Sequence, residues 1–418
     1  MKYKIKNIKS LWFNNLKVAE NYFFMTSLQV AIILINLLLY PYLIRTLGKE
    51  SYGTYIFIVS NIQFFAIFIS FGFSLPALKK ISLFPDDNKI KSQTVSEVFT
   101  AKIYLFVLCA IVLAALIPLI PFVRKNAIFY LVIFITPLTD ILFPQWYFQG
   151  VQKMKFVTYV NLTLRILTIP LIFIFIKSPA DLLKFTLIVT LLPVLGGIFT
   201  FSYLQIKEKI QIRFVSLKNL KSVFKDALPF FWTLMLGKAK LEAVTFIIGT
   251  FFSMESVALY DLANKIVNIP RIITNSINSA LFPKVIKNYS SERVKEIIKY
   301  EKIIGLTVTI LIAAFGYWAV LILGGREMLA SYPLAVILSF TIYAWLIVGC
   351  YIDFLFIPHH KYYFVTKNQF AALVSFLLLS VISLIVSENI IALILAYTLS
   401  HVVEIIYCRY LIKKHQLL

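Results

Sequence analysis

A set of ionisable residues stands inside the otherwise apolar runs of this sequence. The basic members are Arg165, Lys238, Lys240, Lys265 and Arg271. The acidic members are Asp140, Glu242, Asp261, Asp353 and Glu404. Arg and Lys at membrane depth can bind anions such as phosphate, whereas carboxylates there can carry a proton or a metal cation. The basic side chains are therefore candidate ligands for an anionic substrate. The candidates for carrying a proton or a cation are Asp140, Glu242, Asp353 and Glu404.

Polar residues lie on one face of the apolar run at 257–283. At the angular spacing of an α-helix, the face holds Asp261, Asn264, Lys265, Asn268, Asn275, Ser276 and Ser279, with Arg271 at its edge. Such a stripe on a membrane helix is expected to line water inside a helix bundle. The alternative is an amphipathic helix that lies on the membrane surface.

Local spacing leaves several pairings open. Lys238 and Glu242 are four residues apart and could form an ion pair, whereas Lys240 points to another side of the same helix. Arg165 has no carboxylate three or four residues away, which favours an anionic ligand. Asp140 either carries a proton or pairs with Arg165. Asp353 and Glu404 lie towards helix ends, where water could reach them.

The composition shows which elements must position these residues. The chain has 418 residues, of which 60% are hydrophobic and 14% charged, with a mean hydropathy of +0.86. These values predict an all-α integral membrane protein with little room for a soluble domain. The sequence shows no nucleophile–base pair, phosphate-binding loop or metal-ligand cluster, so we expect no enzyme, no cofactor and no metal. The formal charge of +22 does not indicate nucleic-acid binding, because the basic residues lie in short blocks between apolar runs.

Apolar runs predict about twelve transmembrane helices in two six-helix lobes. They cover residues 23–44, 54–75, 103–123, 127–147, 157–177, 182–206, 228–252, 257–283, 303–323, 330–356, 364–386 and 389–412. Residues 1–17 are basic and amphipathic, and are expected to lie on the membrane surface. Placing both termini in the cytoplasm puts most Lys and Arg in cytoplasmic connections, as the positive-inside rule requires.

Two short segments recur at nearly equal offsets. Residues 50–55 (ESYGTY) match 255–260 (ESVALY), and residues 155–158 (KFVT) match 363–366 (YFVT). The repeat predicts a duplicated unit, with an N-terminal lobe at 1–206, a cytoplasmic linker at 207–227 and a C-terminal lobe at 228–418. Transporter sites lie between such repeats.

Two motifs resemble those of a known family. Residues 45–53 (RTLGKESYG) and residues 144–150 (PQWYFQG), continuing through Lys153 and Lys155, are similar to motifs of bacterial polysaccharide repeat-unit flippases. The stretch 227–283 is similar to their seventh and eighth helices. These are the O-antigen and capsule flippases often called Wzx, related to the multidrug MATE exporters of the MOP superfamily.

The resemblance implies a function in the bacterial inner membrane. Such proteins move a repeat unit linked to undecaprenyl pyrophosphate from the cytoplasmic to the outer leaflet. They do so by alternating access through a cationic cavity, coupled to a proton or sodium gradient. A glycan polymerase and its chain-length machinery are candidate partners. The alternatives are a MATE-type drug or cation antiporter, and a flippase for another polyprenyl-linked cell-wall precursor.

Overall fold

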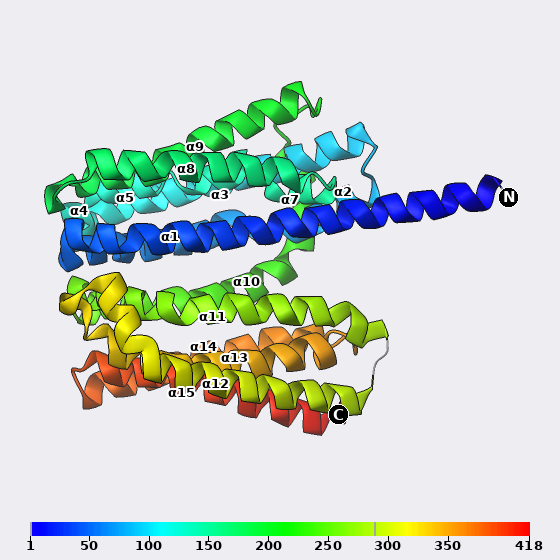
Figure 1. Cartoon of the computed structure of the whole chain (residues 1–418). Coiled ribbons are helices and arrows are strands. Elements are labelled where there is room, and N and C mark those ends of the chain that lie inside the picture. The colour runs from blue at the N-terminus through cyan, green and yellow to red at the C-terminus, as the bar shows by residue number, and fades with distance from the viewer. Residues whose placement is uncertain (1, 288–289) are drawn as a thin grey trace. The chain divides into compact units, whose positions relative to one another are not determined.

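The computed structural model describes the backbone of residues 2–287 and 290–418 (Figure 1). The side chains of residues 1–19, 22, 273 and 275–289 lie outside the described part of the chain. Within the described ranges every regular element is a helix, so the predicted all-α class is confirmed. The predicted N-terminal surface segment is helical in its backbone and continuous with α1 (Lys2–Ser70), but its side chains are not described.

The chain forms two compact units whose boundaries do not follow the sequence order. Unit 1 comprises Met1–Leu39 and Ile62–Phe231, and unit 2 comprises Tyr40–Asn61 and Trp232–Leu418. Two long helices, α1 and α10 (Leu217–Phe251), contribute to both units.

The remaining helices belong to one unit each. Those of unit 1 are α2 (Ser74–Leu83), α3 (Asn88–Leu119), α4 (Pro121–Lys125), α5 (Ala127–Ile133), α6 (Pro137–Leu142), α7 (Gln145–Gly150), α8 (Met154–Phe175) and α9 (Leu182–Ile206). Those of unit 2 are α11 (Met254–Lys287), α12 (Ser291–Gly324), α13 (Ser331–Tyr351), α14 (Tyr362–Val386) and α15 (Ile390–Lys414). In unit 2, α13 packs against α11, α12 and α15, and it is accordingly the most buried of the apolar helices.

Nine helices in the described chain are long and apolar enough to cross a membrane. The predicted spans fall on helical segments: most of the first two lies on α1, and the fourth covers the three short helices α5, α6 and α7. Gly48 separates them, because its φ of 74° and ψ of 162° interrupt the helical backbone at a residue without a side chain. The predicted seventh and eighth spans coincide with α10 and α11, which carry several charged residues and are not among the nine.

The PQWYFQG segment forms part of the core of unit 1. Trp146, Tyr147 and Phe148 are buried, and Gly150 lies so close to α2 that an added Cβ would stand 2.7 Å from Ile81 Cγ2. The Tyr147 hydroxyl donates to Glu208, whose carboxylate also accepts from Lys153 at 2.6 Å. The motif therefore joins α2, α7 and the segment after α9.

The connection after α9 is fixed along α3 by a row of hydroxyl groups. Ser92 and Thr100 accept hydrogen bonds from the backbone N–H groups of Gln211 and Val215, at 3.1 and 3.2 Å. Between them, Ser96 accepts from the Arg213 N–H and donates to the Gln211 carbonyl. Hydroxyls four residues apart on α3 thus provide the hydrogen-bond partners that this extended backbone would otherwise lack.

The turns before α8 and α14 share a local geometry. Gln152 and His360 adopt left-handed φ values of 57° and 58° at matching places before α8 and α14. The next residues repeat the same hydrogen bond, from the Lys153 N–H to the Phe148 carbonyl at 2.7 Å and from the Lys361 N–H to the Phe356 carbonyl at 2.8 Å.

Candidate functional site

Lys265 lies in a cluster of aromatic and acidic side chains within unit 2. Its ammonium group pairs with Asp261 on the same helix and donates to the Tyr52 hydroxyl at 3.2 Å. The same group stands 4.8 Å from the centroid of the Tyr40 ring, within cation–π range. Tyr52 in turn donates to Asp261 at 3.3 Å. Three side chains from α1 and α11 therefore hold the charge of Lys265 in place.

The RTLGKESYG motif builds this cluster. Gly53 lets α1 approach α11, because an added Cβ would overlap the Met254 carbonyl oxygen and crowd the Ala258 backbone nitrogen. Beside it, Lys49 forms an ion pair with Glu255 at 3.0 Å. The two copies of the repeated segment therefore contact each other, which explains why Tyr52 is placed against Asp261.

Lys240 is held by a second ion pair in unit 2. Its side chain is 7% exposed, and its Nζ lies 2.5 Å from Glu404 Oε1 on α15. The Tyr397 ring lies 5.4 Å from the same ammonium group, and the buried His401 packs against that ring. His401 was not singled out from the sequence, because a lone histidine in an apolar run carries no spacing signal.

Arg271 differs from these lysines because its partners are neutral. It donates to Asn268 at 3.1 Å and to Thr341 on α13 at 2.7 Å. In the described part of the chain it forms no ion pair, and its Nε is buried without a hydrogen-bond partner. Its charge is therefore not neutralised by protein groups in that part of the chain.

The polar stripe on α11 is only partly described. Asp261, Asn264, Lys265 and Asn268 are half-buried, whereas Leu262, Ala263, Ile266 and Val267 on the other side are packed inside unit 2. Asn275 and Ser279, predicted to extend the stripe, lie outside the described side chains. The described part thus directs its apolar face into the protein and leaves its polar face partly open.

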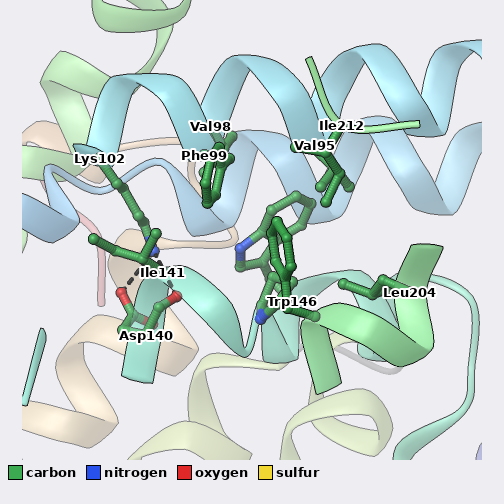
Figure 2. A pocket seen from close by; sticks show the side chains of 11 residues that line it. Val95, Val98, Phe99, Lys102, Asp140, Ile141, Trp146, Leu204 and Ile212 are labelled. Carbon is green, nitrogen blue, oxygen red and sulfur yellow. Dashed lines mark hydrogen bonds and ion pairs between the residues drawn. The ribbon is translucent and has the colours of Figure 1, made fainter. Parts of the chain in front are cut away.

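Unit 1 contains a third lysine–carboxylate pair, shown in Figure 2. Lys102 on α3 is 1% exposed and donates to the Asp140 carboxylate on α6 at 2.6 Å. The pair lines a small cavity together with Trp146, whose indole N–H is buried and has no partner in the described chain. The sequence does not indicate Lys102 as a site residue, because it stands at the polar start of an apolar run.

These contacts correct two pairings left open by the sequence. Asp140 pairs with Lys102 and not with Arg165, and no ion pair joins Lys238 to Glu242. Asp140 takes its partner from another helix, α3, which spacing along its own helix could not indicate. Lys238 is exposed on α10, and Glu242 is half-buried.

Arg165 and Asp353 are the remaining candidate residues predicted from the sequence. Arg165 on α8 is half-buried and makes no ion pair or hydrogen bond among the described residues. Asp353 is half-buried in a π-helical turn, Ile352–Phe356, that extends α13. Such turns are frequent at functional positions in helices.

The arrangement sorts the intramembrane cations into two classes. Lys102, Lys240 and Lys265 are each neutralised by a carboxylate within hydrogen-bonding distance. Arg165, Arg271 and the exposed Lys238 have no ion-pair partner in the described chain. A guanidinium can bind phosphate oxygens through two parallel hydrogen bonds, so the two arginines are best suited to an external anion.

Comparison with known proteins shows that the chain is similar to polysaccharide biosynthesis proteins. A model of the family described as "Polysaccharide biosynthesis protein" matches residues 18–289. The putative O-antigen transporter of Escherichia coli (strain K12) is 26% identical over 318 residues, covering 76% of each chain. A putative O-antigen transporter of Shigella dysenteriae is 23% identical over 293 residues, covering 69% of this chain and 73% of that protein.

Solved structures show that the fold is shared with transporters. The inward closed conformation of the lipid II flippase MurJ has a TM-score of 0.70 at 13% identity, covering 93% of this chain and 87% of that one. An inward-facing multidrug resistance MATE family transporter of the MOP superfamily has a TM-score of 0.68 at 14% identity, covering 92% and 98%. These likenesses establish the architecture.

Proposed function

Since this chain belongs to the polysaccharide biosynthesis protein family, we propose that it is a flippase for lipid-linked polysaccharide repeat units. It is a multi-pass membrane protein with the fold of transporters, and it acts as a carrier rather than as an enzyme. The cargo is an O-antigen or capsule unit on undecaprenyl pyrophosphate. It moves from the cytoplasmic to the outer leaflet of the bacterial inner membrane by alternating access.

The pair of uncompensated arginines is the observation that carries this proposal. An unpaired cation at membrane depth costs several kcal/mol, and such residues are retained where they bind something. A pyrophosphate offers oxygens that replace the missing carboxylate at Arg165 and Arg271. Lys240 and Lys265 are neutralised by their carboxylates in the empty carrier and are secondary candidates for contact with an anion. Lys238, exposed on α10, is a further candidate ligand for an anion.

Coupling to a proton or sodium gradient belongs to the same proposal. Glu242 and Asp353 are half-buried carboxylates that form no ion pair in the described chain. They are better candidates for the coupled ion than Asp140 and Glu404, whose oxygens already accept from lysine. Outward movement of negative charge is favoured by a membrane potential that is negative inside, at about 2.3 kcal/mol per charge per 100 mV. The return of the empty carrier is then the step that uses the ion.

The function is tested first by removing the protein from cells that make the glycan. We expect surface glycan to disappear while lipid-linked repeat units accumulate in the cytoplasmic leaflet. Re-expression of the chain should reverse both changes. Unchanged surface glycan in cells that lack the protein would contradict the proposed function.

The arginines are tested by single substitutions. Arg271→Ala and Arg165→Ala should each lower surface glycan per molecule of membrane-inserted protein by about tenfold or more, since each removes charge-assisted hydrogen bonds. Arg→Lys should restore export only in part, because an ammonium replaces a planar fork. Protein abundance should stay near normal, since no buried carboxylate loses its partner. Arg124→Ala, at an exposed arginine of α4, is the matched control.

A further inference from the structure

Unit 1 contains a lysine-rich groove that is not part of the candidate site described above. Two adjoining cavities, with volumes of 740 and 750 Å³, open between α2, α3 and the first turns of α10. They share Gln93, Glu97, Ser222 and Lys225, and so form one groove. Its basic residues are Lys79, Lys80, Lys218, Lys221 and Lys225. We call it the lysine groove.

The protein holds the α10 side of this groove in a fixed position. The hydroxyl row on α3 anchors residues 211–215, and α10 begins directly afterwards. Leu220 and Ala227 are fully buried, so Lys218, Lys221 and Lys225 fall on the opposite, exposed side of the helix. The lysines therefore face the groove because the apolar side of α10 is packed into unit 1.

The turn between α1 and α2 packs against the same helix. An added Cβ at Gly72 would lie 2.7 Å from the Phe231 backbone nitrogen, and Gly72 has a φ of 74°. Phe71 stacks on Phe231 with ring centroids 4.4 Å apart, and Phe224 meets Phe73 edge-on at 5.2 Å. A rigid aromatic junction thus forms one end of the lysine groove.

The groove carries an excess of positive charge. Of its two carboxylates, Glu97 already accepts from Lys80 at 3.4 Å and from Gln93 at 2.7 Å, and Asp226 is exposed. Lys79, Lys218, Lys221 and Lys225 have no ion-pair partner in the described chain. Several free ammonium groups around one cavity are suited to a multiply charged phosphate.

Apolar side chains line the other wall of the groove. Leu75, Leu83, Phe84 and Phe230 all expose between 38% and 63% of their surface. The apolar runs that end near residue 75 and start near 228 place this wall at a membrane boundary. The cavity therefore presents lysines and hydrocarbon side by side, as a lipid with a phosphorylated head would require.

We propose that the lysine groove is a capture site for the diphosphate head of the lipid-linked glycan before translocation. The proposal rests on the proposed function and on the expectation that this end of unit 1 faces the cytoplasm. The diphosphate contacts Lys218, Lys221 and Lys225, and the start of the polyprenyl chain lies along Leu83 and Phe84. A diphosphate carries more charge than the single phosphate of a membrane phospholipid, which is why the lysines favour it.

The test measures lipid binding by the full-length protein in nanodiscs of phosphatidylcholine. The probes are a polyprenyl diphosphate, phosphatidylglycerol and inorganic diphosphate. The variant K218Q/K221Q/K225Q should bind the polyprenyl diphosphate about tenfold more weakly than the wild type. The variant K218R/K221R/K225R should bind it normally. The matched control is K295Q/K299Q/K413Q, which removes three exposed lysines of unit 2 and should change affinity less than about twofold.

Several outcomes would overturn the capture site. An equal loss in the control variant would show that only the net charge matters, and a loss confined to phosphatidylglycerol would show an ordinary phospholipid contact. Normal diphosphate binding with reduced glycan export in K218Q/K221Q/K225Q would show that the lysines contact another protein. Failure of the wild type itself to restore surface glycan would instead refute the proposed function.

Discussion

At the scale of single residues, the main distinction is between cations that have a carboxylate partner and cations that do not. A lysine that forms an ion pair with a buried carboxylate has a structural role, because separating the two leaves an unpaired charge in a medium of low dielectric. Lys240 with Glu404 is of this kind, whereas in the Lys102–Asp140 pair only the lysine is buried. An arginine that donates only to Asn268 and Thr341 loses little when a phosphate takes over part of its hydrogen bonding.

The Lys240–Glu404 pair gives a test of this distinction. Lys240→Met should lower stability by about 3–5 kcal/mol, because Glu404 then stands buried without its partner. The double variant Lys240→Met with Glu404→Gln should recover most of the loss. The measurement is the apparent Tm of the detergent-solubilised protein, with Lys238→Met at an exposed position of the same helix as the control. A double variant no more stable than the single one would refute the assignment of this pair as structural.

At the scale of elements, close helix approaches depend on a few glycines. Gly53→Ala should lower the apparent Tm, with a cost of about 1–3 kcal/mol or more, because the new Cβ meets the Met254 backbone rather than a movable side chain. Gly349→Ala in α13 is the control, since nothing lies within 4 Å of its added Cβ. There the Tm should be unchanged or slightly raised, as alanine favours a helix. Equal effects at both sites would mean that α1 and α11 do not pack as described.

The elements were largely predictable from the sequence, and their contacts were not. Long apolar runs define the helices, but the repeat of 50–55 at 255–260 did not indicate that Tyr52 and Asp261 meet. Spacing along one helix reports only neighbours three or four residues away. It therefore suggested Lys238 with Glu242, whereas Lys240 finds its partner 164 residues further on. Lys102 was missed because α3 begins well before its apolar run does.

The connection at 207–227 shows the same limit. The sequence predicts a cytoplasmic linker there, but it does not indicate that Ser92, Ser96 and Thr100 bind the backbone of this segment or that α10 begins at Leu217. Small hydroxyl residues four apart on a polar helix end look unremarkable in a sequence. Their role appears only when the partner segment is seen beside them.

At the scale of the whole molecule, the orientation of the chain in the membrane decides whether the lysine groove can bind a lipid from the cytoplasmic leaflet. Capture of a cytoplasmic lipid requires Lys218 and its neighbours to face the cytoplasm, and export requires the opposite ends of the helices to face outward. The positive-inside rule gives this orientation from the placement of Lys and Arg. The three native cysteines, Cys109, Cys350 and Cys408, are all buried, so single cysteines can be added with little background labelling.

Cysteine labelling with a membrane-impermeant maleimide tests the orientation directly. Glu255→Cys, in the first turn of α11, should react in intact spheroplasts because the predicted topology places it outside. Lys218→Cys and Lys295→Cys should react only after the membrane is opened, since both lie on exposed cytoplasmic positions in that topology. Ile266→Cys should stay unlabelled throughout, because its side chain is packed inside unit 2, whereas the half-buried Asn268→Cys should be reachable by water. Labelling of Lys295→Cys in closed spheroplasts would place α12 the other way round. The chain would then cross the membrane an odd number of times between Lys218 and Lys295. The predicted topology of the second half, on which the proposed outward transport depends, would be wrong.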